Sequence, residues 1–240
     1  MPLSNSKKQF QLVKDGLINL LFPDVCIGCE TELSVRENYL CYTCWESIHL
    51  TYFEGFKEPS SLDKLFWGRV ELNATYALFY FQRGKASQKL LHALKYQFKG
   101  NLGVYLGSYA ATKLINHPIF KEVQALIPVP LHPKKAFIRG YNQSERIAQG
   151  ISTVWKIPVI QQEVLKTKHT ESQTKKDQFQ RWDNVTSIFK VKGDLSNYQH
   201  IAIVDDVITT GSTLESMAKE LKAANPSLQI SIISLALAKS

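Results

Sequence analysis

Several features are missing from this chain, and each absence excludes a class of protein. No apolar run approaches the roughly 18 residues that a membrane-spanning helix needs, so no membrane span is expected. The N-terminal apolar stretch LINLLF is short and lacks a small-residue cleavage site, which favours a cytoplasmic protein over a secreted one. Neither GxxxxGK[S/T] nor a GxGxxG that follows a strand occurs, so the common P-loop and dinucleotide-binding fingerprints are excluded.

The composition is that of a globular protein with an excess of positive charge. Hydrophobic residues make up 44% of the 240 residues and charged residues 21%, while the net charge is +8. The charge is unevenly distributed: residues 24–63 carry eight acids and two bases, and residues 131–192 carry twelve bases and five acids. The second region favours a polyanionic partner, either a nucleic acid or a phosphorylated small molecule.

Cysteine is scarce, and all four cysteines lie in the segment CIGCETELSVRENYLCYTC. They form two CxxC pairs, Cys26 with Cys29 and Cys41 with Cys44, separated by eleven residues. Two such turns can direct four thiolates at one point, as in the tetrahedral shell of a zinc ion. Because this shell leaves no position for water, we predict a structural zinc. Disulfides and a redox pair are alternatives, but no secretion signal favours the former and the latter needs no duplicate.

Three parts are predicted along the chain: an amphipathic helix in residues 1–22 from its apolar spacing, the zinc module in 23–65 from its cysteines, and a main domain in 70–240. Strand patterns alternate with helix patterns in the main domain, which predicts an α/β fold with a parallel sheet flanked by helices. The strands are expected at 73–81, 124–130, 157–160, 187–191, 201–205 and 228–238, and the helices at 84–98, 102–115, 142–155 and 216–224. Residues 166–184 are charged and aperiodic, so a long exposed loop is expected there.

Two adjacent carboxylates, Asp205 and Asp206, follow the apolar strand pattern IAIV. Ligands of open α/β sheets bind beyond the carboxyl ends of the strands, where we expect this pair. The next segment, TTGST, combines backbone N–H groups, hydroxyls and a helix start, which suits a phosphate. A phosphate beside two acids fits a ribose 5-phosphate, whose hydroxyls the acids would bind directly or through hydrated Mg²⁺. Alternatively, the acid pair only caps a turn.

This order of residues closely resembles the signature that binds phosphoribosyl pyrophosphate (PRPP) in type I phosphoribosyltransferases. The resemblance implies that Asp205 and Asp206 bind the ribose hydroxyls and that PRPP is bound together with Mg²⁺. It also implies a 5-phosphate site made of Thr209, Thr210, Gly211, Ser212 and Thr213.

A longer segment, VPLHPKKAFIRGYNQSERIA at 129–148, is similar to a hallmark of the ComF family of bacterial competence proteins. That family also carries an N-terminal four-cysteine module and an LKY segment, here residues 94–96. Its pattern QxxxxxxxRxxNV is matched by Gln173, Arg181, Asn184 and Val185, so the resemblance covers nearly the whole chain.

The ComF resemblance implies a type I phosphoribosyltransferase-like domain that binds PRPP and handles single-stranded DNA during natural transformation. It places the protein in the cytoplasm, at the inner face of the membrane through partners such as a DNA-uptake helicase or other competence proteins. The alternative is an active phosphoribosyltransferase, of the glycosyltransferase class, that transfers ribose 5-phosphate from PRPP to a nitrogen acceptor. The sequence identifies neither an acceptor base nor a catalytic residue, and it leaves open whether a reaction is catalysed.

Basic and aromatic residues are interleaved in the second half of the chain. Lys134, Lys135 and Arg139 are expected to bind pyrophosphate or DNA phosphates, although a solvated turn would also contain such residues. Neighbouring aromatic residues would either stack on DNA bases or pack in the core: Phe137, Tyr141, Phe179 and Trp182.

Two departures from the family pattern bear on the chemistry. Lys166, Lys168 and His169 stand where arginines are expected, so the positive charge is kept without the bidentate geometry of arginine. Thr209 stands where purine-salvage relatives often have an acid that acts on the base. Salvage of hypoxanthine or guanine is therefore disfavoured.

Overall fold

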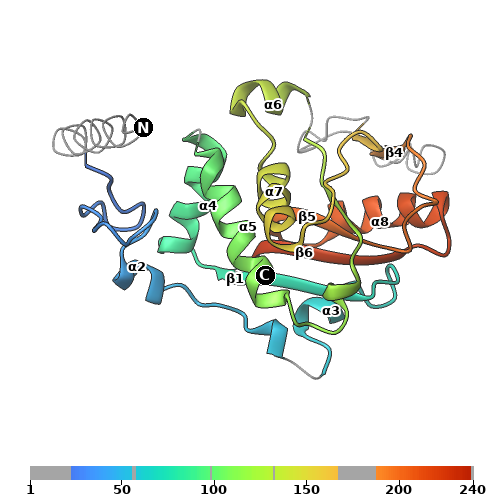
Figure 1. Ribbon diagram of the computed structural model, residues 1–240, viewed down its shortest axis with the longest axis horizontal. Helices are drawn as coiled ribbons and strands as arrows, with labels where there is room; N and C mark the ends of the chain where they lie inside the picture. Colours follow the sequence, from blue (N-terminus) through green and yellow to red (C-terminus); the bar gives the residue numbers. More distant parts are fainter. Residues whose placement is uncertain (1–22, 56–57, 98, 132, 167–187, 239–240) are drawn as a thin grey trace, which may run out of the picture.

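Four parallel strands form the central sheet of the protein (Figure 1). The computed structural model describes residues 23–55, 58–97, 99–131, 133–166 and 188–238. The strands lie side by side in the order β1 (Ala74–Phe81), β6 (Gln229–Ala238), β5 (His200–Ile208) and β2 (Ala125–Pro128). Each neighbouring pair is parallel, which confirms the predicted α/β class.

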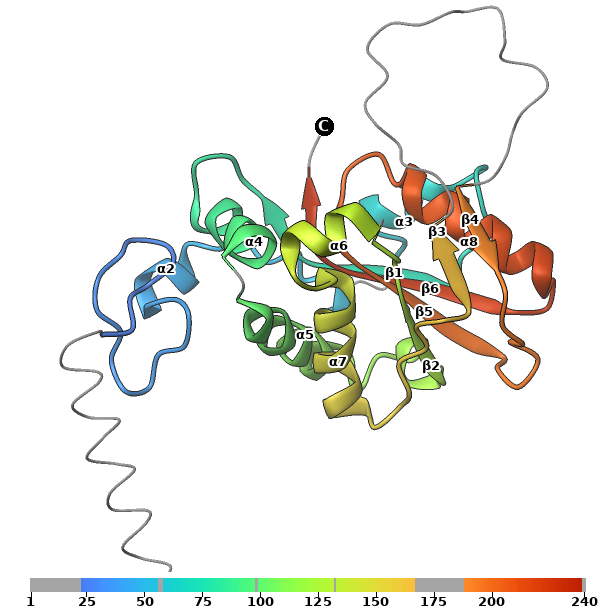
Figure 2. The ribbon, with the colours of Figure 1, turned by 90° about the horizontal axis from the view of Figure 1, so that it is seen from above.

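Helices cover both faces of this sheet (Figure 2). One face carries α4 (Ala86–Tyr96), α5 (Gly100–Leu114) and α7 (Gln143–Trp155), and the other carries α3 (Ser61–Phe66) and α8 (Ser212–Ala224). Because helices cover both faces, the central strands β5 and β6 are almost continuously buried, and their sequences are nearly uninterrupted apolar runs.

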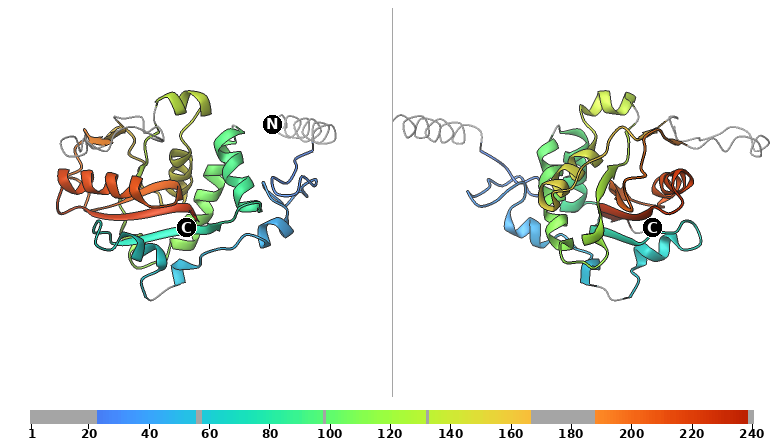
Figure 3. Two further views of the ribbon diagram at one scale, coloured as in Figure 1. Left: turned by 180° about the vertical axis from the view of Figure 1, so that it is seen from behind. Right: turned by 45° about the vertical axis from the view of Figure 1, so that its right-hand side comes forward.

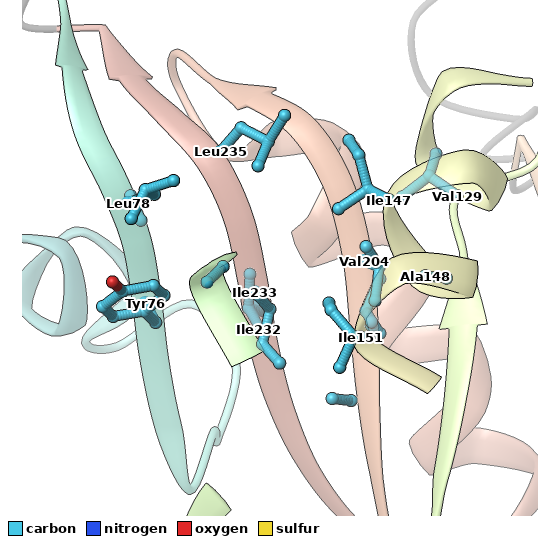
Figure 4. Packing of buried hydrophobic residues seen from close by; sticks show 14 of the residues in the cluster. Tyr76, Leu78, Val129, Ile147, Ala148, Ile151, Val204, Ile232, Ile233 and Leu235 are labelled. Carbon is cyan, nitrogen blue, oxygen red and sulfur yellow. The ribbon is translucent and has the colours of Figure 1, made fainter. Parts of the chain in front are cut away.

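One part of the core lies between the sheet and the helix pair α5 and α7 (Figure 4), and buried residues of α3 and α8 form the part on the other face. Ile147 and Ile151 of α7 point towards Val204 of β5, and all three side chains are fully buried. The two helices approach closely where each has a glycine. A Cβ atom on Gly107 would lie 2.2 Å from the carbonyl oxygen of Ile147, and one on Gly150 would lie 2.1 Å from that of Val104. Any side chain at either glycine would force the helices apart.

The segment that follows the cysteines extends the sheet at its β1 edge. It runs from α2 (Tyr42–Glu46), which contains the last cysteine, to the short 3-10 helix η1 (Phe53–Gly55). Between them, the N–H of Tyr80 donates to the carbonyl of His49 at 2.8 Å, and the N–H of Thr51 donates to that of Leu78 at 3.1 Å. This antiparallel pairing covers the free edge of β1. The cysteine segment lies at one end of the molecule, and α8 lies at the other (Figure 3).

The remaining elements show where the sequence-based prediction was incomplete. The strand expected at 157–160 is a single bridge between Val159 and Leu126. Six short elements were not predicted as such: α2, η1, α3, the 3-10 helix η2 (Phe120–Glu122), α6 (Pro133–Arg139) and β3 (Val164–Lys166). β3 pairs with β4 (Phe189–Val191) in a separate antiparallel ribbon.

Two expectations fall outside the residues that the structure describes: the helix in 1–22 and nearly all of the loop in 166–184, with Lys168, His169, Phe179 and Trp182. Among the described helices, none is long and apolar enough to cross a membrane.

Candidate functional site

Asp205 and Asp206 lie beside the boundary between β2 and β5. The helices that follow these two strands, α7 and α8, cover opposite faces of the sheet, which makes this boundary a switch point of the kind where α/β proteins bind ligands. β2 pairs with β5 only as far as Val204, whereas β5 continues to pair with β6 through Ile208. The acids therefore lie within the last part of β5 and not beyond its end, where the sequence placed them.

Asp205 is held by the first turn of α7. The hydroxyl of Ser144 donates to Oδ1 of Asp205 at 3.0 Å, and the N–H of Asp206 donates to the same oxygen at 2.9 Å. Ser144 is placed there because Asn142 caps the helix: its Oδ1 accepts from the N–H of Ser144 at 3.1 Å. The Nδ2 group of Asn142 also donates to the carbonyl of Val129 at 3.0 Å. The YNQS part of the long family segment thus positions the carboxylate.

Asp206 is buried and pairs with a lysine from another part of the sequence. Nζ of Lys95, in the last turn of α4, lies 2.9 Å from Oδ2 of Asp206. Lys95 was not predicted as a site residue, although it lies in the LKY segment. Only the fold brings this lysine, 111 positions earlier, to the acid pair.

Burial and mutual repulsion determine the protonation of the acid pair. Removal from water, followed by the charge of Asp206, raises the pKa of Asp205 to about 7, and Lys95 opposes this shift. A bound cation or a set of hydroxyl donors would relieve the repulsion between the carboxylates. The pair is therefore suited to a metal ion, a diol or both.

The segment from Thr209 to Thr213 connects the acid pair to α8. Gly211 is the N-cap of this 13-residue helix and has φ +73°, a conformation that favours glycine. Thr209, Thr210 and Ser212 are exposed, and the hydroxyls of Thr210 and Ser212 lie 3.1 Å apart. Free N–H groups at a helix start, with hydroxyls beside them, suit a phosphate.

The three basic residues predicted to bind phosphates, Lys134, Lys135 and Arg139, all lie on α6. Lys134 and Lys135 are within this helix, but their side chains lie outside the described residues. Nη1 of Arg139 donates to Oε1 of Gln143 at 2.8 Å, and its guanidinium lies 5.5 Å from the ring centre of Tyr96. Tyr96 directly follows Lys95 in α4, so the stack joins α6 to the end of the helix that carries this lysine.

The aromatic residues of this region have different surroundings. Phe137 is 92% exposed and Ile138 is 70% exposed on α6, so neither packs in the core. Tyr141 is instead half-buried, and its hydroxyl donates to the carbonyl of Leu94. Of the two aromatic residues that can be described, only Phe137 is free to stack on a ligand.

The four cysteines form a second candidate site. Their Sγ atoms all lie within 4.8 Å of one another, and those of Cys29 and Cys41 lie 3.6 Å apart. Sulfurs in a tetrahedral zinc shell are roughly 3.8 Å apart, so this donor set fits a zinc ion. The N–H groups of Gly28 and Cys41 donate to Sγ of Cys26 at 3.3 and 3.2 Å, which favours a thiolate there. A hydrogen bond from the Thr31 hydroxyl lowers the pKa of Cys29 to about 6.

The cysteine segment is attached to the main domain by polar and aromatic contacts. Nζ of Lys89, in α4, donates to the carbonyl of Gly28 at 2.6 Å. Trp45 packs edge-on against Tyr109, with ring centres 5.1 Å apart, and Tyr39 lies 5.4 Å from Tyr105. Helices α4 and α5 therefore form the surface on which this segment rests.

Fold and site together define an α/β protein with an acidic pair and a hydroxyl-rich loop at the switch point of its sheet, joined to a module whose four cysteine sulfurs could hold a metal ion. Similarity to curated proteins assigns the family. The chain is 31% identical to Competence protein F of Haemophilus influenzae over 219 residues, which span 82% of this chain and 90% of that protein. It therefore belongs to the ComF family.

Two further relatives agree with this assignment. Competence protein ComFC of Bacillus subtilis is 28% identical over 228 residues, covering 90% of this chain and 86% of the relative. DNA utilization protein YhgH of Escherichia coli K12 is 27% identical over 158 residues, covering 65% and 66%. A scan against protein-family models found no match.

We predict that the purified chain contains one zinc ion and that Cys29→Ser and Cys41→Ser each abolish zinc binding, because a tetrahedral shell needs all four thiolates. Metal analysis gives the zinc stoichiometry, and amide hydrogen exchange shows which residues lose structure in the variants. Protection should be lost in residues 23–48 and kept in β5 and β6, since the module contributes little to the central core. Full zinc content in either variant would contradict the assignment.

The raised pKa of Asp205 predicts a specific pH dependence of stability. Between about pH 4 and pH 7 the folded chain binds more protons at Asp205 than the unfolded chain does, so this residue makes stability fall as the pH rises. Asp205→Asn should therefore lose less stability than the wild type between about pH 5 and pH 7.5, as measured by denaturant unfolding. Asp194→Asn is the control, because a hydrogen bond from the Ser196 N–H lowers the pKa of that exposed carboxyl. Equal pH dependence in all three proteins would refute the prediction.

Proposed function

We propose that the chain binds PRPP with Mg²⁺ at the switch point between β2 and β5 and acts in the cytoplasmic handling of single-stranded DNA during DNA uptake. The observation that carries the first part is the juxtaposition of two acids on β5 with a hydroxyl-rich loop at the start of α8. Asp205 and Asp206 would bind the ribose hydroxyls or Mg²⁺, and residues 209–213 would bind the 5-phosphate. A bound Mg²⁺ would supply the positive charge that offsets the pyrophosphate.

Lys95 is well placed to take part in this binding. It neutralises Asp206 while no ligand is bound, at a distance of 2.9 Å. A ribose diol or Mg²⁺ that takes over Asp206 would free the ammonium group. The pyrophosphate of the same ligand could then accept from it, since an ammonium group is a strong donor to phosphate oxygens.

The role in DNA uptake is supported by family membership and by the exposed surface of α6. Relatives over most of the chain are named competence proteins, and YhgH is named a DNA utilization protein. On α6, Phe137 and Ile138 are exposed beside Arg139, in the region where the chain is most basic. Aromatic groups among cations suit single-stranded DNA, because the rings stack on bases and the cations follow the phosphates. A DNA-uptake helicase or other competence proteins would be the protein partners.

Catalysis at the same site is the second candidate, and it is favoured by Lys95, which pairs with Asp206, and by Arg139, which stacks on Tyr96 next to that lysine in the sequence. A nitrogen acceptor would form a bond to C1 of PRPP as the bond from C1 to the pyrophosphate oxygen breaks. These cations would stabilise the charge that develops on the leaving pyrophosphate. Thr209 cannot act as an acid or base towards a purine, so this candidate requires a different acceptor.

Calorimetric titration of PRPP with Mg²⁺ into zinc-loaded protein tests the proposed PRPP site. Asp205→Asn/Asp206→Asn should lower the affinity at least about 100-fold, because two charge-assisted interactions with ribose or Mg²⁺ are lost. Asp194→Asn, which changes an exposed carboxyl elsewhere on the surface, should bind as the wild type does. If the folded wild type does not bind PRPP, the proposed ligand is wrong. If it binds, candidate acceptors can be screened for release of pyrophosphate.

Binding of single-stranded DNA tests the α6 surface. Phe137→Ala should weaken binding about tenfold through loss of stacking, and Arg139→Gln should reduce the slope of log affinity against log salt by about 0.7. Trp67→Ala is a matched control, since Trp67 is 62% exposed but follows α3, on another part of the surface. Fluorescence anisotropy with a labelled oligonucleotide measures both effects. Equal loss in Phe137→Ala and Trp67→Ala would rule out a specific role for α6.

A further inference from the structure

Arg69, just after α3, makes contacts that join distant parts of the chain. Its Nη1 donates to the carbonyl oxygen of Thr210 at 2.8 Å and to that of Leu65 at 3.1 Å. Its Nε and Nη2 donate to Oε2 of Glu215, in the first turn of α8, at 2.9 and 2.5 Å. One guanidinium group thus bridges the segment before the sheet, the loop that contains Thr210, and α8.

The contact with Thr210 fixes the direction of a donor in the loop. The carbonyl of Thr210 and the N–H of Gly211 belong to the same planar peptide group and point in opposite directions. Because Arg69 holds the carbonyl on one side, the N–H must point to the other. Within the described part of the chain, this N–H has no hydrogen-bond partner, so a phosphate oxygen that reaches the buried Gly211 would be its acceptor.

Phe66, the last residue of α3, packs against the same loop. A Cβ atom on Gly211 would lie 2.8 Å from two atoms of the Phe66 ring, and the guanidinium of Arg69 lies 5.7 Å from the centre of that ring. The loop is therefore packed against α3 as well as held by Arg69. Both contacts keep the peptide between Thr210 and Gly211 in one orientation.

Arg69 also offsets a charge that would oppose an anion. Glu215 lies in the first turn of α8, and hydrogen bonds from Lys219 and Arg69 keep its pKa low, so it carries a negative charge at neutral pH. Lys219 binds Oε1 of Glu215 at 2.7 Å, and Arg69 binds Oε2. Of these two cations, only Arg69 also contacts the loop. Replacing Lys219 therefore removes a charge near Glu215, whereas replacing Arg69 removes both a charge and a contact with the loop.

We propose that Arg69 is a positioning residue for the 5-phosphate of a ribose 5-phosphate ligand. It turns the N–H of Gly211 towards the phosphate and does not itself contact the ligand. This inference rests on the proposed function, because it assumes that residues 209–213 bind a phosphate.

The test titrates ribose 5-phosphate and PRPP with Mg²⁺ into the zinc-loaded wild type, Arg69→Met, Arg69→Lys and Lys219→Met. Arg69→Met should lose about tenfold or more in affinity for both ligands, the value of one hydrogen bond to a charged group. Lys219→Met should stay within about twofold, since it removes a cation from Glu215 without touching the loop. Arg69→Lys should fall between them, because a single ammonium cannot reproduce the planar geometry of arginine.

A second readout distinguishes positioning from general stability. In the wild type, ribose 5-phosphate should shift the amide resonance of Gly211, and in Arg69→Lys this shift should be reduced at ligand saturation. If the wild type binds neither ligand, the proposed function itself is wrong. If the wild type binds these ligands and both Arg69 variants bind them as tightly as the wild type does, the role of Arg69 is refuted. The proposed ligand site is then still supported. Equal losses in Arg69→Met and Lys219→Met would show a charge effect and also refute positioning.

Discussion

The close placement of two carboxylates in a largely buried setting is the constraint on which the rest of the site depends. Adjacent anions repel each other, and removal from water makes their charge costly. Asp205 is relieved by hydrogen bonds from Ser144 and from the backbone, and Asp206 by the ammonium of Lys95. These partners come from α7, β5 and α4, so the acid pair can exist only when three separate elements are assembled around it.

The sheet topology explains why the pair lies where it does. β2 is short and stops pairing at Val204, so the following residues of β5 have a neighbour on one side only. After β2 the chain leaves the sheet and forms α6 and then α7. The side chain of Ser144, in the first turn of α7, therefore reaches Asp205.

Local patterns predicted much of this fold, because an apolar strand, a following helix and a glycine-containing loop are encoded by contiguous residues. Thus β5, the loop from Thr209 to Thr213 and α8 were all anticipated. Lys95 and Arg69 were not, because their roles come from contacts across 111 and 141 residues that no local pattern encodes. The strand expected at 157–160 failed for a different reason. Pro158 has no N–H to donate, and its carbonyl accepts from Leu126, so pairing there is limited to a single bridge.

Helix α4 gives a physical link between the metal module and the acid pair. Lys89, near its middle, holds the backbone of the cysteine segment at Gly28, and Lys95, in its last turn, holds Asp206. Between them, Leu90, Leu91 and Leu94 are buried in the core, so the helix cannot shift at one end and stay in place at the other. The cysteine module thus contacts α4 through Lys89, and Lys95 in the last turn of the same helix supplies the counter-charge to Asp206.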